Sequence, residues 1–236
     1  MKMPNSFRCL LLVLISSILI SACGPFVTST PPSSPQPIQV AFTPTLSPLI
    51  ERLHQCALEH PEIALITHTT TIIGLEETSA DLILWMGEPP QGPYKNAFTL
   101  GEDSIVIIAG DNVRLQDLSI DQLRDLYIHP GSTYQIWTYP PGHELRNLFD
   151  NVVMRENATN ANVLLAPNPA AMLEAIAANP LAVGYVPGSW LEKAIQTITV
   201  EEELQDAFTQ PVLALSLREP TGNLRTYLAC LQNADR

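Results

Sequence analysis

The side chains that could carry out catalysis or bind a metal are few in this sequence and lie far apart. Ser189 follows a glycine but lacks the second glycine of a nucleophile elbow. A structural zinc site needs closely spaced histidine and cysteine ligands. The histidines do not have that spacing; they are His54, His60, His68, His129 and His143. We therefore expect no metal, no cofactor and no enzymatic activity, and an extracellular hydrolase cannot be assembled from these residues.

Cys23 is the cysteine whose position suggests a reaction. Lys2 and Arg8 precede an apolar run that reaches Ile20, and small residues lead to Cys23. This is the pattern of a secretory signal, and a cysteine after a small residue resembles the bacterial lipobox, in which the thiol is acylated. We expect a lipoprotein signal peptide at 1–22 and a lipid on Cys23. The alternative is an ordinary signal peptide with an incidental cysteine.

Cys56 and Cys230 would be the thiols left after that acylation. An even pair in an oxidising compartment favours a disulfide, which would join the first and last helices. The alternative is two separately buried thiols that behave as small apolar side chains.

Composition limits the partners. The net charge is −12, and removal of Lys2 and Arg8 would make it −14. Such an acidic chain is not expected to bind nucleic acid or anionic lipid surfaces. A small anion could still be held by backbone N–H groups. The 46% apolar content indicates a globular protein.

The order of predicted elements indicates an α/β fold. A Thr, Ser and Pro tract at 23–37 predicts an extended tether. Strands are predicted at 38–42, 64–67 and 80–85, with a helix between the first two. Ser119 and Gln122 predict a capping box at the start of a further helix. Later strands are expected at 97–100, 104–109, 135–139, 181–186 and 211–215, and later helices at 143–153, at 169–178 and from 223.

Three segments resemble a known family. The run 118–127, then Trp137-Thr138-Tyr139-Pro140, then 182–187 are similar in order and spacing to the second lobe of phosphate-type solute-binding proteins. These proteins have the type II periplasmic-binding-protein fold and serve ABC importers. The resemblance implies two lobes, each a mostly parallel sheet flanked by helices, with the ligand between them. It implies a first lobe at 38–102 and 191–236 and a second lobe at 103–190.

The resemblance also implies where a ligand would bind. Positions carried over are Thr43 and Thr45 after the first strand, Asp81 and Trp85 at the third, and the helix start with Gly142, His143, Glu144 and Arg146. Each has a plainer alternative. The threonines can cap a helix together with Ser47, Asp81 can end a loop, and Trp85 can be a core residue. His143 can be solvated while Glu144 complements a helix dipole.

One departure from the family concerns the ligand. The family has an arginine and a Ser-Gly-Thr run where this chain has Tyr139 to Glu144, so a carboxylate replaces anion donors. We still expect a lipid-anchored, extracytoplasmic, monomeric receptor that captures a small solute, possibly an oxyanion, for an ABC permease. The alternative is a degenerate lipoprotein of the same fold that serves as a surface sensor or interaction module.

Overall fold

The computed structural model describes residues 34–89, 93–191 and 195–233. The predicted signal peptide and Cys23 lie outside this part of the chain. The predicted tether reaches residue 37, but the first strand, β1 (Gln36–Phe42), begins one residue earlier than the tether ends.

The first lobe is built on parallel strands in the order β2-β1-β3, where β2 is Ile63–Thr69 and β3 is Leu82–Met86. Alternating residues of β1 face opposite sides of this sheet. Val40 and Phe42 pack with α2 (Ile50–Glu59) and α8 (Gly222–Asn233), whereas Ala41 packs with α3 (Ile72–Glu77). Helices therefore cover both faces of the sheet. A 3-10 helix, η1 (Pro44–Leu49), connects β1 to α2.

The second lobe repeats this design. Strand β5 (Gln135–Thr138) runs parallel to both β6 (Leu164–Leu165) and β7 (Ala182–Pro187). Its helices are α4 (Ile120–Ile128), α5 (Glu144–Phe149), α6 (Pro169–Ala178) and α7 (Glu202–Phe208), and α5 continues into the π-helical η2 (Asp150–Met154). The core is rich in fully buried aromatic rings, among them Tyr127, Phe149 and Tyr185. Ser119 forms the predicted capping box with Gln122 at the start of α4, which confirms that prediction.

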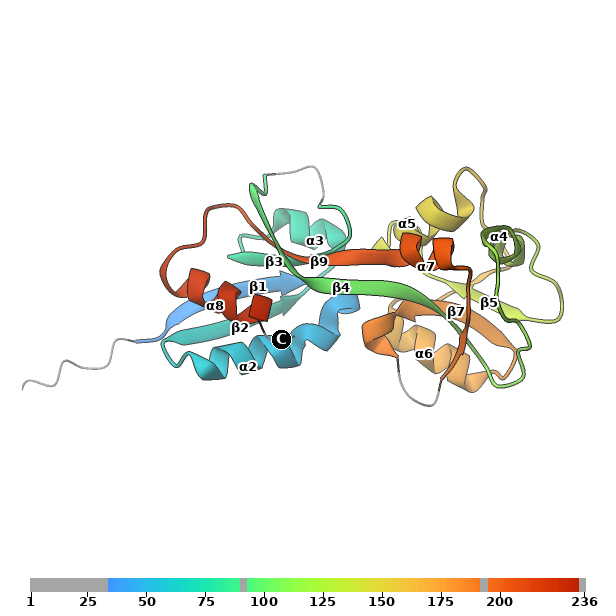
Figure 1. Cartoon of the computed structure of the whole chain (residues 1–236), viewed down its shortest axis with the longest axis horizontal. Coiled ribbons are helices and arrows are strands. Elements are labelled where there is room, and N and C mark those ends of the chain that lie inside the picture. Colours follow the sequence, from blue (N-terminus) through green and yellow to red (C-terminus); the bar gives the residue numbers. More distant parts are fainter. Residues whose placement is uncertain (1–33, 90–92, 192–194, 234–236) are drawn as a thin grey trace, which may run out of the picture. The chain divides into compact units, whose positions relative to one another are not determined.

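Two long antiparallel strands connect the lobes. β4 (Asn96–Ala109) pairs with β9 (Thr209–Ser216) through its first part and with β7 and β8 (Gln196–Ile198) through its second part. Figure 1 shows β4 and β9 side by side between the two groups of helices. The fold is thus the mixed α/β, two-lobe type II periplasmic-binding-protein fold that the sequence predicted.

The return of the chain to the first lobe differs from the prediction. The predicted boundary was residue 191, but Ile198, Leu204 and Phe208 are buried in the core of the second lobe. The chain leaves that lobe only along β9. The two strands predicted at 97–100 and 104–109 are one strand, with a register shift between Thr99 and Gly101. The 3-10 turn η3 (Gly188–Trp190) lies between β7 and β8.

A disulfide joins Cys56 in α2 to Cys230 in α8, with 5.8 Å between their Cα atoms. The predicted pairing is confirmed. Because both helices pack on the same face of the first sheet, the bond fastens the last helix of the chain to the first helix of that lobe.

Candidate functional site

The lobes meet at a crevice where strands of both sheets end. A cavity of about 490 Å³ lies there. From the first lobe it is lined by the residues that follow β1 and β2, and from the second lobe by the loop that follows β5; the lining residues are Thr43, Pro44, 69–73, 140–144 and Pro167. The carboxyl ends of strands are the usual position of ligand sites in open α/β sheets.

A second cavity of about 420 Å³ adjoins the first one. It shares Ile72 and Glu144 with the first cavity, and it extends to Trp85 and Glu88 at the end of β3 and to Gln210 in β9. We define the crevice as these two cavities together.

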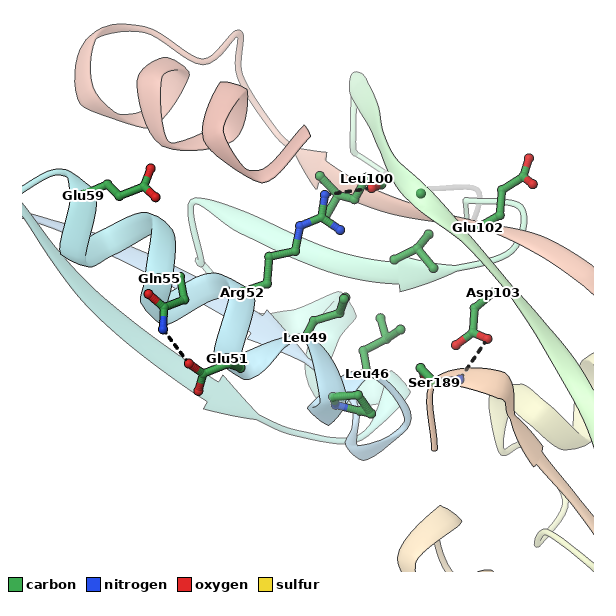
Figure 2. A pocket seen from close by; sticks show the side chains of 13 residues that line it. Leu46, Leu49, Glu51, Arg52, Gln55, Glu59, Leu100, Glu102, Asp103 and Ser189 are labelled. Atoms are coloured by element: carbon green, nitrogen blue, oxygen red, sulfur yellow. Dashed lines mark hydrogen bonds between the residues drawn. The ribbon is translucent and has the colours of Figure 1, made fainter. Parts of the chain in front are cut away.

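A larger cavity lies elsewhere. It has a volume of about 740 Å³ and lies beside α2 and β4 (Figure 2). Arg52 donates hydrogen bonds there to the carbonyls of Leu100 and Leu231, and the Ser189 amide donates to Asp103. Most of its lining comes from η1, α2 and the side of β4, and not from loops at the ends of parallel strands. We therefore place the candidate site in the crevice and not in this larger groove.

The loop after β5 positions the second lobe's contribution to the crevice. Gly142 has a φ of +85°, a conformation that side chains with a Cβ rarely adopt, and it turns the chain into α5. His143 is the N-cap of α5: its Nδ1 accepts a hydrogen bond from the Leu145 amide at 3.3 Å. The imidazole is stacked on the Tyr139 ring, with 4.4 Å between the ring centroids. Burial lowers the pKa of His143 to about 4, so the ring is neutral near pH 7.

Glu144 connects the two lobes. Its carboxylate accepts a hydrogen bond from the hydroxyl of Thr43, which lies at the end of β1. Burial raises the pKa of Glu144, and the hydroxyls of Thr43 and Thr45 partly offset this effect. Thr45 Oγ1 has no hydrogen-bond partner of ordinary geometry among the described residues, so we regard Thr43 as the partner of the carboxylate.

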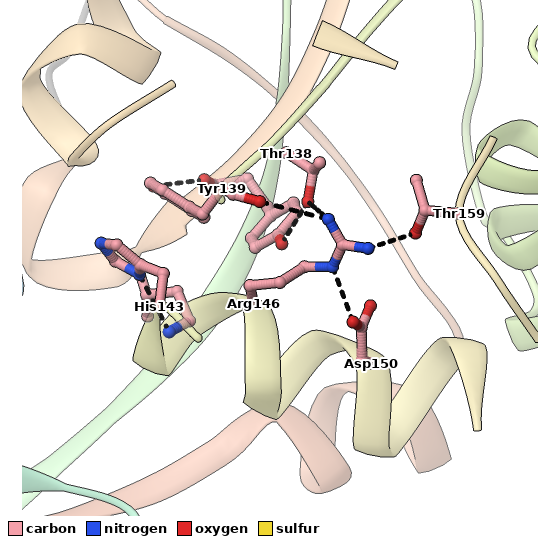
Figure 3. Close-up of polar contacts among 8 residues, drawn as sticks. Thr138, Tyr139, His143, Arg146, Asp150 and Thr159 are labelled. Carbon is pink, nitrogen blue, oxygen red and sulfur yellow. Dashed lines mark hydrogen bonds and ion pairs between the residues drawn. The ribbon is translucent and has the colours of Figure 1, made fainter. Parts of the chain in front are cut away.

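Arg146 points away from the crevice, into the second lobe (Figure 3). Its guanidinium donates to Asp150 at 2.7 Å, to Thr159 at 2.7 Å and to the Tyr139 carbonyl at 3.1 Å. All of these hydrogen bonds go to residues of the second lobe, and Arg146 lines neither cavity of the crevice.

The other residues implied by the resemblance divide into two groups. Trp85 lines the second cavity, and its indole N–H donates to the Glu88 carbonyl at 2.8 Å. Thr45 is buried behind the crevice, where its carbonyl accepts from the Trp190 indole at 2.6 Å. Asp81 precedes β3, at the opposite end of the strand from the crevice, and accepts a hydrogen bond from the Gln39 amide. The structure therefore brings Thr43, Gly142, His143, Glu144 and Trp85 to the crevice, and not Asp81 or Arg146.

Sequence reasoning missed the threonines at the carboxyl end of β2. Thr69, Thr70 and Thr71 all line the first cavity, and Thr71 also caps α3 by accepting from the Gly74 amide. The signal was present in the sequence as a run of three hydroxyl side chains that begins two residues after the end of the strand predicted at 64–67.

One group of metal-ligand types occurs in the described residues. The side chains of Glu59, His60 and Cys230 approach one another, with their ligand atoms within 4.8 Å. Because Cys230 is bonded to Cys56, it offers no thiolate, and a metal site is not supported there.

Comparisons with known proteins identify the family. The model of the LysR substrate binding domain matches residues 34–235, and the chain belongs to this family. No match was found among curated proteins.

Solved structures with the same fold include proteins of two classes. A putative phosphate ABC transporter substrate-binding protein from Clostridium perfringens, with bound phosphate, is 14% identical with a TM-score of 0.72, covering 83% of this chain and 93% of that one. The CcmR regulatory domain of Synechocystis, in complex with 2-PG, is 17% identical with a TM-score of 0.67, covering 84% and 96%. An H2O2-bound OxyR mutant from Corynebacterium glutamicum is 16% identical with a TM-score of 0.64, covering 98% and 73%.

The family match corrects the functional prediction. The chain belongs to the LysR substrate-binding domains, so the assignment to receptors of ABC importers is wrong, and with it the permease partner. The exclusion of nucleic acid as a partner and the expectation of a monomer are also overturned, because LysR-type regulators bind DNA and oligomerise.

The predicted location is corrected on the same ground. The family match overturns the extracytoplasmic location and the alternative of a lipoprotein surface sensor, and the lipid on Cys23, which lies outside the matched residues 34–235, lacks support. Within the described residues, none of the helices combines the length and apolar character required to cross a bilayer.

The pKa of His143 leads to a prediction about acid stability. Its folded-state value of about 4 lies below the ordinary 6.5, so the folded protein binds this proton less readily than the unfolded chain does. The stability contribution of neutral His143 is complete above pH 6.5 and is lost as the pH falls from 6.5 to 4, by roughly 2 kcal/mol after allowance for partial exposure.

Urea unfolding at a series of pH values measures this loss. The variant His143→Asn keeps a side-chain acceptor at the N-cap but does not titrate, and we expect a flatter profile between pH 6.5 and 4. Identical profiles for His143→Asn and the unmodified chain would contradict the prediction.

Arg146 should matter for stability and not for ligand affinity. Replacement by methionine leaves Asp150 without its cation, and Asp150 keeps 34% of its side chain exposed. We therefore expect a loss of roughly 2 kcal/mol, less than for a fully buried pair. Asp150→Asn in the same chain should recover part of this loss. A variant with unchanged unfolding but reduced ligand affinity would instead place Arg146 in the ligand site.

Proposed function

We propose that this chain is the effector-binding domain of a regulatory protein, which holds a small molecule in the crevice and makes no covalent change to it. The observation that carries the proposal is that two adjoining cavities of about 490 and 420 Å³ lie where both lobes contribute residues. Volumes of this size are typical of sites for small molecules. Membership of the LysR substrate-binding domains supports the regulatory role.

Because both lobes line the crevice, a bound ligand can change how the two lobes are arranged. Thr43 belongs to the first lobe and Glu144 to the second, and both line the first cavity. A ligand that bonds to both lobes stabilises the arrangement in which they are close, and it shifts the population of the domain toward that arrangement. The proposed signal is therefore a change in how the two lobes are held.

The fold relatives support a response to small molecules. One of them is a regulatory domain in complex with 2-PG, and another is an H2O2-bound OxyR. Because LysR-type regulators bind DNA and oligomerise, the partners that we propose are DNA and further copies of the chain.

A thermal-shift screen with a matched pair of variants tests the proposal. The library should contain anionic, neutral and cationic metabolites. Thr69 lines the first cavity, whereas the neighbouring exposed residue His68 does not, so Thr69→Trp should obstruct the crevice and His68→Trp should not. We expect compounds that raise the Tm of the unmodified chain and of His68→Trp but not of Thr69→Trp. A library without any stabilising compound, or stabilisation that survives in Thr69→Trp, would refute the proposal.

A further inference from the structure

The described residues that line the crevice include two carboxylates and neither lysine nor arginine. The two carboxylates are those of Glu88 and Glu144. A bound anion would meet these carboxylates with no opposing cation from the lining, and it would be repelled by them. An organic cation would be attracted, and more strongly the less water remains between the charges.

Among the described residues, the side chains that could offer a positive charge to an anion lie outside the crevice, are neutral or are already bonded. Arg146 is held within the second lobe by Asp150, Thr159 and the Tyr139 carbonyl. His143 is neutral near pH 7, and its Nδ1 already accepts a hydrogen bond from the Leu145 amide. The first turn of α5 already contains a carboxylate, that of Glu144, which complements the helix dipole.

The Glu144 carboxylate has capacity for a further donor. One of its oxygens, Oε1, accepts from Thr43. Besides Thr43, only the Thr45 hydroxyl among the described residues acts on this carboxylate, and an ionised carboxylate can accept more than two hydrogen bonds. Glu144 lines both cavities, so a donor in either cavity can reach this carboxylate. A protonated amine supplies up to three N–H donors and the matching charge.

The remaining lining suits the other parts of an organic amine. The indole of Trp85, fixed by its bond to the Glu88 carbonyl, lines the second cavity, and an aromatic ring attracts an organic cation. The hydroxyls of Thr69, Thr70 and Thr71 can accept further N–H groups, and the prolines of the first cavity offer apolar contact.

We propose that the crevice selects a small organic amine in its protonated form, with Glu144 as the residue that binds the ammonium group. The inference rests on the proposed function, which it narrows from a small molecule to a cationic one. It also differs from the oxyanion that the resemblance implied.

Compounds that differ only in charge test this proposal. Phenethylamine, 2-phenylethanol and phenylacetate share a skeleton, and butylamine, butanol and butyrate form a second series. Calorimetry on the full chain should give an amine affinity at least about tenfold above that of the matching carboxylate, and this preference should shrink in high salt. Glu144→Gln keeps the shape of the side chain and should remove most of the preference. Glu77→Gln removes one carboxylate at an exposed position of α3 that lines neither cavity, and it should leave the preference intact.

The outcomes separate this inference from the proposed function. Carboxylates or inorganic phosphate could bind more tightly than the amines, with the rise in Tm lost in Thr69→Trp. That result would overturn the assignment of an amine ligand, but the proposal of an effector-binding domain would stand. Equal amine binding by Glu144→Gln and the unmodified chain would overturn the role of Glu144. No binding by any amine would overturn the inference, and the wider library decides whether the proposed function fails with it. The ranking of charge classes uses the unmodified chain, so it holds even if Glu144→Gln does not fold.

Discussion

Replacement of both Cys56 and Cys230 by alanine should lower the free energy of unfolding by about 4 kcal/mol. The two cysteines are 174 residues apart in sequence, so the bond constrains most of the unfolded chain that the structure describes. In the chain-entropy model, the stabilisation by a cross-link grows with the length of the loop that it closes. The bond also holds α8 against α2, and the loss should therefore affect the first lobe most.

Urea denaturation with and without a thiol reductant measures this effect. The reductant should destabilise the unmodified chain by a similar amount and leave the double-alanine variant unchanged. An unmodified chain that is indifferent to reductant would show that the bond does not form in solution. Hydrogen exchange should show the largest increase in opening at α2 and α8.

Replacement of Phe149 by alanine should cost about 3 to 5 kcal/mol and act on the second lobe. The ring is fully buried and stacked on Tyr185, with 4.3 Å between the centroids, and it lies 4.6 Å from the Tyr127 ring. Alanine would leave a cavity between rings that α4 and β7 hold in place, so the surroundings can collapse only in part.

A graded series separates loss of volume from other effects. Phe149→Leu retains most of the volume and should cost about 1.5 kcal/mol or less, while Ile73→Ala, at a position with 68% exposure, should stay within about 0.5 kcal/mol. Denaturant unfolding gives the ranking. Equal losses for Phe149→Leu and Phe149→Ala would contradict the explanation by cavity formation.

Local patterns predicted the parts of the fold that local interactions determine. The capping box at Ser119 needs only residues three apart, and α6 was expected at 169–178, where it is found. The single strand β4 was expected as two, because the polar stretch around Gly101 resembles a turn. Pairing with β9 on one side keeps the strand continuous through that stretch, and such long-range pairing leaves no local signal.

The candidate site was predicted less completely. The sequence places Arg146 near the start of a helix, but it does not show where the side chain points. Hydrogen bonds to Asp150 and Thr159 hold the guanidinium inside the second lobe. Asp81 was assigned to the ligand site because it lies next to a predicted strand. Only the direction of that strand shows that Asp81 lies at the end away from the crevice.

The class of protein was missed for a related reason. The segments 118–127 and 182–187 form a capped helix and a fully buried strand, both of which build the second lobe. Such features specify the fold, and several functional classes share it. The chain-wide family match was needed to choose among them.

The pairing of β4 with β9 has a mechanical consequence. The chain crosses between the lobes twice, along β4 and along β9, and these two strands are paired with each other. The pairing runs from Asn96, which lies opposite Ser216, to Ser104, which lies opposite Thr209. A two-stranded ribbon bends and twists as a unit, so it acts as one hinge with few independent directions of rotation. Spectroscopic labels far from this ribbon, for example at Leu58 and Leu165, which are both exposed, would magnify a small rotation into a measurable change of separation.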